Sequence, residues 1–334
     1  MESVQMESVA VAAGFDSMVH GQLLERRHRL EHARTRIGAH DDLSRLLSEV
    51  DAALSRFDSG AFGVCIECKG DVEPDRLIND PLLSVCLGCL NEAQISALES
   101  DLQLAADIQR GLLPKSGVAC DRWLVDYAYH PASIVSGDYV DIIERGEEFF
   151  FLLGDVSGKG MAASLLMSNL HAIFHSLVPT GMPLVELMSR ANHLLCESSP
   201  ANQFATLVLG RANRAGEVEV VNAGHLAPVL IKKGMIGELN HSGLPLGMFC
   251  SAEFEANRVE LQKGDGLFLF TDGVTEQVDS EGAEYGTTGL FNAIACETAR
   301  TPNELIRYCL GHIDEFRGQT PRHDDLTILA LAYN

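Results

Sequence analysis

The sequence predicts an α+β protein whose N-terminal and C-terminal parts differ in kind. Before Pro114 the composition is helical and is interrupted by a group of four cysteines. After Pro114, short apolar β-like runs are separated by grouped helical stretches. Runs of strands with helices gathered between them are typical of a layered α+β sandwich and not of a regular βαβ alternation. With 334 residues, 46% of them hydrophobic, the chain has core material for two domains.

The N-terminal part is expected to contain two helical regions. Residues 1–16 are expected to be disordered, whereas 17–59 is rich in Leu, Ala, Glu and Arg and contains no proline, so we predict a helical region that Gly60 ends. A second helix is predicted from Asn91 to Leu113, before Pro114. Apolar residues step by three or four along it, at Ile95, Leu98, Leu102, Ala105, Ile108 and Leu112. This seam fits packing within its own domain and a short coiled coil with a second copy equally well.

The predicted domains are therefore a disordered segment 1–16, a helical cysteine-containing domain 17–90, a linker helix 91–114 and a larger domain 115–334. In the larger domain, strands are predicted at Trp123–Tyr129, Phe149–Leu153, Ala205–Gly210, Val218–Val221, Ala227–Ile231, Gly266–Phe270 and Leu326–Leu331. Helices are predicted at Met161–Leu177, Pro183–Ser198 and Pro302–Phe316.

The charge balance limits the classes of partner. A formal net charge of −22 argues against nucleic acid or an anionic membrane as the main partner, because both attract cationic surfaces. The N-terminus lacks the basic region of a signal peptide, and no run of about 18–20 apolar residues indicates a membrane span. We therefore expect a cytoplasmic protein. The stretch from Gly264 to Ala299 has seven acidic residues and no Lys or Arg, which suits a segment facing cations.

Two CxxC pairs predict a structural zinc site. Cys65 and Cys68 are separated by 17 residues from Cys86 and Cys89. Each pair supplies two thiolates from one turn, and four thiolates complete the zinc tetrahedron without leaving a position for a catalytic water. We therefore expect one structural Zn²⁺. The other five cysteines are expected to be buried small hydrophobic residues without a function; these are Cys120, Cys196, Cys250, Cys296 and Cys309.

The text around these cysteines resembles the C4 zinc finger of the DksA/TraR family. The resemblance covers Leu47–Glu92 and includes the helix entering the finger and the stretch from Asp75 to Pro81. Proteins of that family act at RNA polymerase through a helical hairpin with an acidic tip. Here the helical segment before the finger is short. The resemblance therefore implies a small sensor or docking module, and one alternative function: an RNA polymerase-binding regulator in which the larger domain is a scaffold.

Four short motifs in the larger domain place aspartate beside small residues and near apolar strands. They are SGDYVD (136–141), GDVSGKG (154–160), TDGVTE (271–276) and HDDLT (323–327). A single Asp-Gly is usually only a turn. Four of them close to buried strands are hard to explain as turns, and clustered carboxylates would raise one another's pKa unless cations lay between them. Mg²⁺ and Mn²⁺ prefer such oxygen ligands, so the motifs predict a divalent-metal site.

The order of the motifs resembles the SpoIIE/RsbU branch of the PPM-type phosphatases. That branch reads GGDFYD, GDVSGHG, NAGH, GLPLG, SDGxTE and DDxT; this sequence has SGDYVD, GDVSGKG, NAGH (222–225), GLPLG (243–247), TDGVTE and DDLT in that order. The resemblance runs from Leu98 to Leu331 and implies an αββα sandwich. Ser136, Val140 and Lys159 depart from the pattern or vary within it, and none of them removes a ligand.

The resemblance implies roles for particular residues. The carboxylate ligands of two Mn²⁺ or Mg²⁺ ions would be Asp138, Asp155, Asp272 and Asp324, helped by the backbone carbonyl of Val156. Further residues that would lie outside the ligands are Asp141, His225, Glu276 and Asp325. His225 fits a catalytic role and a backbone-bonding role equally well, Glu276 is either close to the ligands or simply exposed, and Lys159 is expected to be solvated.

The implied function is a metal-dependent protein serine/threonine phosphatase. A metal pair about 3.5–4 Å apart lowers the pKa of a bridging water and holds phosphate oxygens, so no cysteine or serine nucleophile is needed. The resemblance implies a phosphorylated anti-anti-sigma (STAS-type) protein as the substrate, in a bacterial pathway that controls transcription, and a homodimer formed through the linker helix. A phosphatase for small phosphoesters is the third reading.

Overall fold

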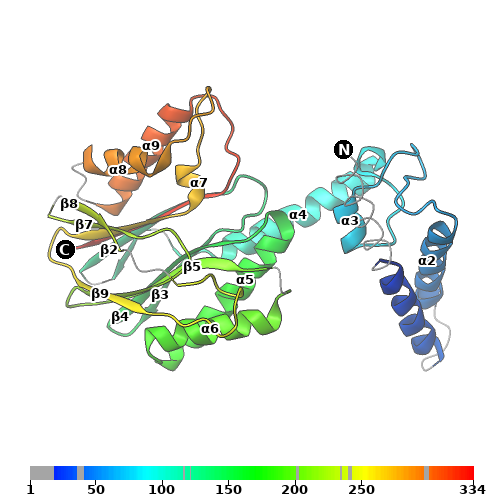
Figure 1. Cartoon of the computed structure of the whole chain (residues 1–334), viewed down its shortest axis with the longest axis horizontal. Coiled ribbons are helices and arrows are strands. Elements are labelled where there is room, and N and C mark those ends of the chain that lie inside the picture. The colour runs from blue at the N-terminus through cyan, green and yellow to red at the C-terminus, as the bar shows by residue number, and fades with distance from the viewer. Residues whose placement is uncertain are drawn as a thin grey trace, which may run out of the picture. The chain divides into compact units, whose positions relative to one another are not determined.

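The structure, a computed structural model, describes residues 19–35, 41–115, 117–120, 122–200, 203–233, 235–239, 243–296 and 301–334. The segment 1–16, expected to be disordered, lies outside the described residues. The chain divides into two compact units, Met1–Ser100 and Asp101–Asn334, which can be followed by colour in Figure 1. This boundary falls inside the predicted linker helix and not at either of its ends.

The first unit is helical, with a cysteine-rich loop region. It contains a helical segment over 19–35, α2 (Asp41–Asp58), α3 (Pro74–Asn79) and the single-turn helix η1 (Leu87–Cys89). Val19 and Leu23 pack against Val50 and Ala53 in a small core. Gly60 follows the end of α2 with φ +68°, a left-handed conformation that glycine adopts without strain.

Helix α4 (Glu92–Leu112) agrees with the predicted linker helix within one residue at each end. Asn91 caps it reciprocally with Gln94: the Gln94 amide donates to Asn91 Oδ1 (2.9 Å) and the Asn91 amide donates to Gln94 Oε1 (3.1 Å). The C-terminal part of α4 belongs to the second unit. There Gln109 is buried and bonds both the carbonyl (2.7 Å) and the amide (3.0 Å) of Ser136.

The second unit contains two antiparallel sheets. The six-stranded sheet has the order β1-β2-β11-β10-β7-β8, and the five-stranded sheet has the order β3-β4-β5-β6-β9. The first comprises β1 (Val118–Cys120), β2 (Trp123–His130), β7 (Val229–Lys232), β8 (Met235–Glu238), β10 (Gly266–Phe270) and β11 (Leu326–Tyr333). The second comprises β3 (Tyr139–Arg145), β4 (Glu148–Val156), β5 (Ala205–Asn213), β6 (Glu217–Ala223) and β9 (Ala256–Glu260).

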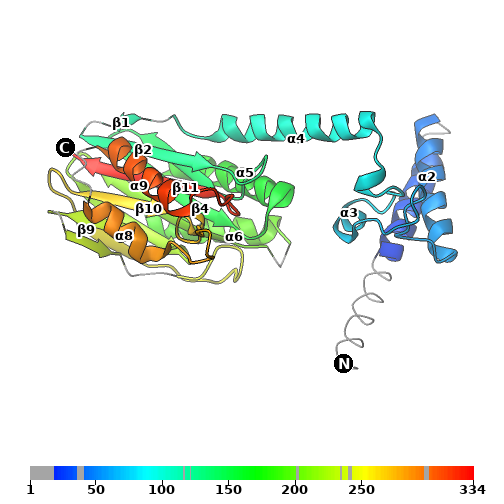
Figure 2. The same ribbon diagram turned by 90° about the horizontal axis from the view of Figure 1, so that it is seen from above.

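Helices cover the outer face of each sheet, so the unit has four layers. Helices α5 (Gly160–Leu177) and α6 (Leu184–Ser198) pack on the five-stranded sheet. Helices α8 (Gly286–Cys296) and α9 (Pro302–Arg317) pack on the other, as Figures 1 and 2 show. The sequence of β10 is apolar throughout because both faces of the strand are buried: Leu267 faces the opposite sheet and Phe268 faces the helices. The predicted αββα sandwich is confirmed.

The seven predicted strands and three predicted helices of this unit are all present, with ends shifted by a few residues. Four strands and three helices were not predicted, namely β1, β3, β8, β9, the single-turn helix η2 (Val178–Thr180), α7 (Asp272–Thr275) and α8. Strand β3 was hidden because Asp141 and Glu144 interrupt its apolar pattern. Helix α8 begins with GTTG, which favours a turn more than a helix.

The segment 160–180, which includes helix α5, is long and apolar enough to cross a membrane by length and composition. Half of it is buried inside the unit. Met167, Leu170 and Phe174 are fully buried against the five-stranded sheet. Packing in the core therefore accounts for its apolar composition.

The expectation for the scattered cysteines was wrong in two respects. Cys196 and Cys250 form a disulfide that joins the end of α6 to the segment before β9, with their Cα atoms 5.8 Å apart. Cys296 is exposed, whereas Cys309 is buried as expected. The two bonded residues are 54 positions apart in the sequence, so only the tertiary structure brings them together.

Candidate active site

The four aspartate motifs lie at strand ends in both sheets. Asp138 directly precedes β3, and Asp155 is the penultimate residue of β4. These two strands pair with each other, with Tyr139 opposite Gly154. Asp272 follows β10, and Asp324 precedes β11, the strand that pairs with β10. Each sheet therefore contributes two of the four aspartates.

The Asp138 carboxylate is buried and is held by two threonines of the other sheet. Thr271 Oγ1 donates to Asp138 Oδ2 at 3.0 Å, and Thr327 Oγ1 donates to the same oxygen at 2.5 Å. The Thr327 amide in turn donates to Thr271 Oγ1 at 3.0 Å. These bonds fix the start of β3 against the ends of β10 and β11. Among the described residues both side-chain donors use Oδ2, which leaves Oδ1 for a cation.

Asp325 positions the loop before Asp138. Its Oδ1 accepts from the Ala132 amide at 2.7 Å, and its Oδ2 accepts from the Gly137 amide at 2.9 Å. The Asp325 amide donates to Asp324 Oδ1 at 2.9 Å. One residue thus connects the loop of the first motif to the aspartate of the last, which is the kind of supporting contact expected outside a ligand set.

The carboxylates repel one another. Burial raises the pKa of Asp155 to about 7, with further contributions from the charges of Asp272, Asp324 and Asp325. The pKa of Asp272 is also raised, by burial and by Asp324. Burial raises the pKa of Asp138 well above its ordinary value. Such a group of carboxylates is a place where bound cations lower the electrostatic free energy.

Lys159 is exposed, as expected, but it is not simply solvated. Its ammonium donates to Asp324 Oδ2 at 2.7 Å and to the His323 carbonyl at 3.1 Å. The bond to Asp324 raises the pKa of Lys159. This lysine directly precedes α5 and partly neutralises the carboxylates.

His225 adopts the backbone-bonding arrangement. Its Nε2 lies 3.2 Å from the Phe270 carbonyl, which can only accept, so Nε2 carries the proton. Nδ1 then accepts from Thr206 Oγ1 at 2.8 Å. Burial lowers the pKa of His225 to about 4, so the ring is neutral at pH 7. His225 therefore connects the end of β10 in one sheet to the start of β5 in the other, where Thr206 pairs with Asp155 of β4.

Two further predicted residues have different environments. Glu276 is exposed and lies near Asp272, and partial burial together with that charge raises its pKa. The Asp141 carboxylate faces α5, and the contacts of its Oδ2 are Tyr139, His171 and His175. The family resemblance implied a place outside the ligands, and β3 directs this side chain toward the helix layer.

Two glycines allow close approaches between the motifs. A Cβ added to Gly137 would lie 3.1 Å from the Val156 carbonyl and 3.5 Å from Asp155 Oδ1, so a larger residue there would need the second motif to shift slightly. A Cβ on Gly273 would clash with the Asp325 carbonyl. The glycines thus let the first motif lie close to the Asp155 carboxylate and the Val156 carbonyl, which are oxygen donors of the kind that Mg²⁺ and Mn²⁺ prefer.

The comparison with known families matches this arrangement. The model of the Stage II sporulation protein E (SpoIIE) family matches residues 145–334, more than half of the chain. The chain belongs to the SpoIIE family. The match includes Asp155, Asp272 and Asp324, whereas Asp138 lies just before it.

Curated relatives of this SpoIIE-family chain cover it to different extents. It is 26% identical over 239 residues to phosphoserine phosphatase RsbU of Bacillus subtilis, covering 70% of both chains. It is 24% identical over 268 residues to protein IcfG of Synechocystis, covering 70% of this chain and 42% of IcfG. Phosphoserine phosphatase RsbP of Bacillus subtilis is 27% identical over 188 residues, which are 54% of this chain and 46% of RsbP. The chain therefore spans less than half the length of IcfG and RsbP.

Solved structures share the fold. The SiaA-PP2C domain of Pseudomonas aeruginosa superposes with a TM-score of 0.65 at 20% identity, covering 73% of this chain and all of that chain. The PP2C phosphatase domain of SpoIIE from Bacillus subtilis superposes with a TM-score of 0.57 at 17% identity, covering 64% of each chain. The second unit thus has the fold of these PP2C domains.

The four predicted zinc cysteines come together in the first unit. One sulfur from each of Cys65, Cys68, Cys86 and Cys89 lies within 4.8 Å of the others. The Cys86 amide donates to Cys65 Sγ and the Gly70 amide donates to Cys68 Sγ, each at 3.4 Å. The first of these bonds helps lower the pKa of Cys65 to about 6. This clustering fits a tetrahedral thiolate site; the zinc ion and the DksA/TraR-like identity of the finger stay predictions.

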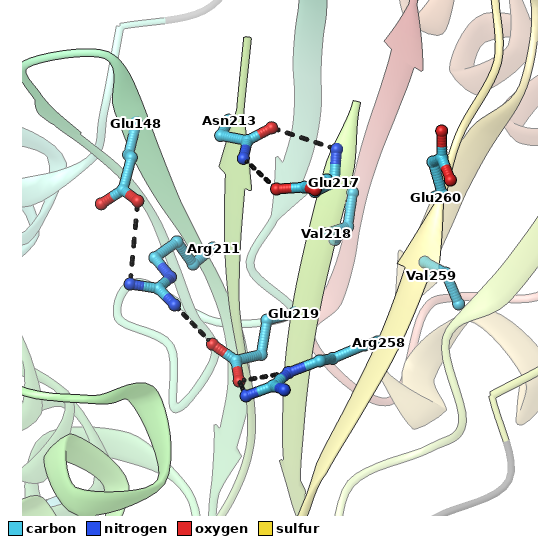
Figure 3. Close-up of a pocket in the computed structure, with 9 residues that line it drawn as sticks. All are labelled: Glu148, Arg211, Asn213, Glu217, Val218, Glu219, Arg258, Val259 and Glu260. Carbon is cyan, nitrogen blue, oxygen red and sulfur yellow. Dashed lines mark hydrogen bonds and ion pairs between the residues drawn. The ribbon is translucent and has the colours of Figure 1, made fainter. Parts of the chain in front are cut away.

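A concave surface elsewhere on the five-stranded sheet is lined by none of the residues predicted for the active site (Figure 3). Its volume is about 520 Å³. Glu219 pairs there with Arg211 (2.7 Å) and with Arg258 (2.9 Å). Because these opposite charges satisfy one another, we assign this surface no role in the chemistry.

Proposed function

We propose that this chain is a metal-dependent protein serine/threonine phosphatase. Its two Mn²⁺ or Mg²⁺ ions would be held by Asp138, Asp155, Asp272 and Asp324 and by the carbonyl of Val156. The observation that carries the proposal is the group of mutually repelling carboxylates formed by four separate motifs, with the pKa of Asp155 raised to about 7. Membership of the SpoIIE family supports it.

The residues of this chain would shape the site for phosphate-ester hydrolysis. When bound, such metal ions supply a water of lowered pKa and positive charge against the phosphate oxygens. Thr271 and Thr327 hold the Asp138 carboxylate in place, and Asp325 holds the loop beside it. Lys159 shares Asp324 with any bound cation and would limit metal affinity there.

Metal-dependent turnover by wild type and Asp272→Asn tests the catalytic assignment. We expect Mn²⁺-dependent hydrolysis of a phosphoprotein to fall by roughly a thousandfold in the variant, because loss of one carboxylate ligand removes several kcal/mol of charge stabilisation. Glu281→Gln is the matched control, since Glu281 is an exposed acidic residue of the same segment. Equal rates for wild type and Asp272→Asn would disprove the assignment.

We further propose a phosphorylated anti-anti-sigma (STAS) protein as the substrate, in a cytoplasmic signalling pathway that controls transcription. Two relatives, RsbU and RsbP, are phosphoserine phosphatases. The competing substrate is a small phosphoester. A kcat/KM for a phosphorylated STAS protein that exceeds that for p-nitrophenyl phosphate by orders of magnitude would support the protein substrate, and the reverse ratio would favour the small molecule.

The proposed homodimer would form through α4. Ile95, Leu98 and Ile108 on its seam are exposed by 40%, 45% and 58%. The double variant Leu98→Asp with Leu102→Asp should lower the mass in solution and change the turnover. The same mass and turnover as wild type would count against a regulatory dimer.

The second candidate function is the RNA polymerase-binding regulator, and the clustering of the four cysteines favours a folded docking module in the first unit. The two functions separate in Asp272→Asn. Transcriptional effects that survive this substitution would support the regulator, and effects that disappear with turnover would support the phosphatase.

A further inference from the structure

Asp141, the last residue of the first motif, forms a cluster with two histidines that includes none of the proposed ligands Asp138, Asp155, Asp272 and Asp324. Asp141 lies on β3, and His171 and His175 lie on α5, which packs on that strand. Asp141 Oδ2 is 2.8 Å from His175 Nε2 and 3.3 Å from His171 Nδ1. One ligand atom from each of the three residues lies within 4.8 Å of the other two.

The helix brings the two histidines together. Residues four apart share one face of a helix, and the rings of His171 and His175 have their centroids 4.0 Å apart with an interplanar angle of 34°. Two protonated imidazoles in such contact would repel each other. A cation shared by the two rings would remove that repulsion, and metal ions bind imidazole in its neutral form.

His171 carries a buried nitrogen whose contact with Asp141 is not a well-aligned hydrogen bond. Its Nδ1 is buried without a hydrogen-bond partner among the described residues, because the approach to Asp141 at 3.3 Å is not aligned as a hydrogen bond. Buried polar atoms are normally paired. A cation shared with the carboxylate oxygen and the second imidazole would satisfy this nitrogen better than the poorly aligned contact does.

Two protein donors bond the oxygens of the Asp141 carboxylate and orient it. The buried Tyr139 hydroxyl donates to Oδ2 at 2.8 Å, and the Ile142 amide donates to Oδ1 at 2.8 Å. Metal-binding carboxylates are commonly oriented by such hydrogen bonds. Asp141 and Tyr139 are buried, while His175 is exposed on one side, so the cluster is closed toward the sheet and open toward solvent.

We propose that Asp141, His171 and His175 form a binding site for a divalent transition-metal ion of the zinc type. Two imidazole nitrogens and one carboxylate oxygen suit Zn²⁺, whereas Mg²⁺ prefers oxygen ligands alone. Ligand atoms about 2.0–2.2 Å from a tetrahedral zinc lie roughly 3.4 Å from one another. The contacts of Asp141 with the two histidines, at 2.8 and 3.3 Å, need only small adjustments. Water would complete the coordination on the open side.

The ion would join α5 to β3. Strand β3 begins directly after Asp138, and α5 begins directly after Lys159. A metal bound to one residue of the strand and two of the helix would therefore fix the spacing between the elements that carry the first two aspartate motifs. This site does not depend on the phosphatase assignment, because none of its ligands is Asp138, Asp155, Asp272 or Asp324.

Zinc content of the purified full chain tests the proposal. Protein would be equilibrated with limited Zn²⁺ in excess Mg²⁺, and bound zinc measured by plasma mass spectrometry. We expect wild type to hold one equivalent more than His175→Gln and than the double variant His171→Gln with His175→Gln. The four-cysteine site is unaltered in all of them, so it contributes equally. His193→Gln is the matched control, because His193 is also an exposed helical histidine paired with a carboxylate, at 3.2 Å from Glu197.

Thermal unfolding supplies the second measurement. Added Zn²⁺ should raise the melting temperature of wild type and of His193→Gln, because an ion that binds only the folded state stabilises it. It should raise that of the two cluster variants less. His175 is 44% exposed at its side chain, so the single variant removes a ligand with little loss of packing. Equal zinc content and equal zinc-induced shifts in all four proteins would overturn the proposal and leave a hydrogen-bonded Asp–His cluster only.

Discussion

Replacing Thr327 with valine tests how Asp138 is held for metal binding. The change removes one hydroxyl and keeps nearly the same side-chain shape. It leaves in place the bonds of the Thr327 backbone, whose amide donates to Thr271 Oγ1 and whose carbonyl accepts from the Thr271 amide. Thr327 Oγ1 is 2.5 Å from Asp138 Oδ2, in a site where the carboxylate is only 1% exposed. Thr271 would then be the one side-chain donor left to this oxygen among the described residues.

The expected magnitude follows from the charge of the acceptor. A hydrogen bond to a charged group contributes about 1.5–3 kcal/mol, and each 1.36 kcal/mol is a factor of ten. Loss of the hydroxyl should therefore weaken metal binding by roughly 10- to 100-fold, which is also the usual effect of removing a residue that supports a metal ligand. The pKa of Asp138 is already raised by burial, and loss of a donor raises it further, so protons compete better with the metal.

The assay is the Mn²⁺ concentration that gives half-maximal phosphatase activity, measured for Thr327→Val and wild type. Saturating Mn²⁺ should restore most of the turnover, because the variant lacks no proposed ligand. Thr288→Val is the matched control, since Thr288 is exposed on α8. An unchanged Mn²⁺ requirement in a folded Thr327→Val protein would refute the reasoning.

Three further predictions concern the same site. In the metal-free protein the pKa of Asp155 is about 7 when the chain is folded, and it is near the ordinary 3.8 when the chain is unfolded. Between these pH values the folded state therefore binds more protons than the unfolded state, so the melting temperature should fall as pH rises from about 4 to 7. Bound Mn²⁺ should abolish that fall. Lys159→Gln removes the ammonium bonded to Asp324 and should lower the Mn²⁺ requirement several-fold with turnover retained. The control Lys263→Gln should change neither quantity. A large loss of kcat in Lys159→Gln would instead indicate that Lys159 contacts the substrate. His225→Ala leaves a buried hydroxyl and a buried carbonyl without their partner and should lower the free energy of unfolding in urea by about 2–4 kcal/mol; a change under 0.5 kcal/mol would contradict its bridging role.

Local patterns were sufficient for much of the fold. The buried strands β4, β10 and β11 are recognisable as apolar runs, and α4 by its helical seam and its stop at Pro114. Strands β3 and β9 were missed because their core positions alternate with charged residues such as Asp141 and Arg258. The periodicity of so short a strand is lost when one polar residue has a partner in the tertiary structure.

The sequence by itself determined which residue types are present and in what order: four aspartate motifs with a family's wording, and two CxxC pairs with zinc spacing. Tertiary structure decided which of these side chains meet. In the folded chain Asp325 bonds the loop before Asp138, His225 bonds residues of both sheets, and Asp141 contacts the histidines of α5. The physical reason is that the identity of a motif is local, whereas the direction of a side chain depends on strand register and on contacts between residues far apart in the chain.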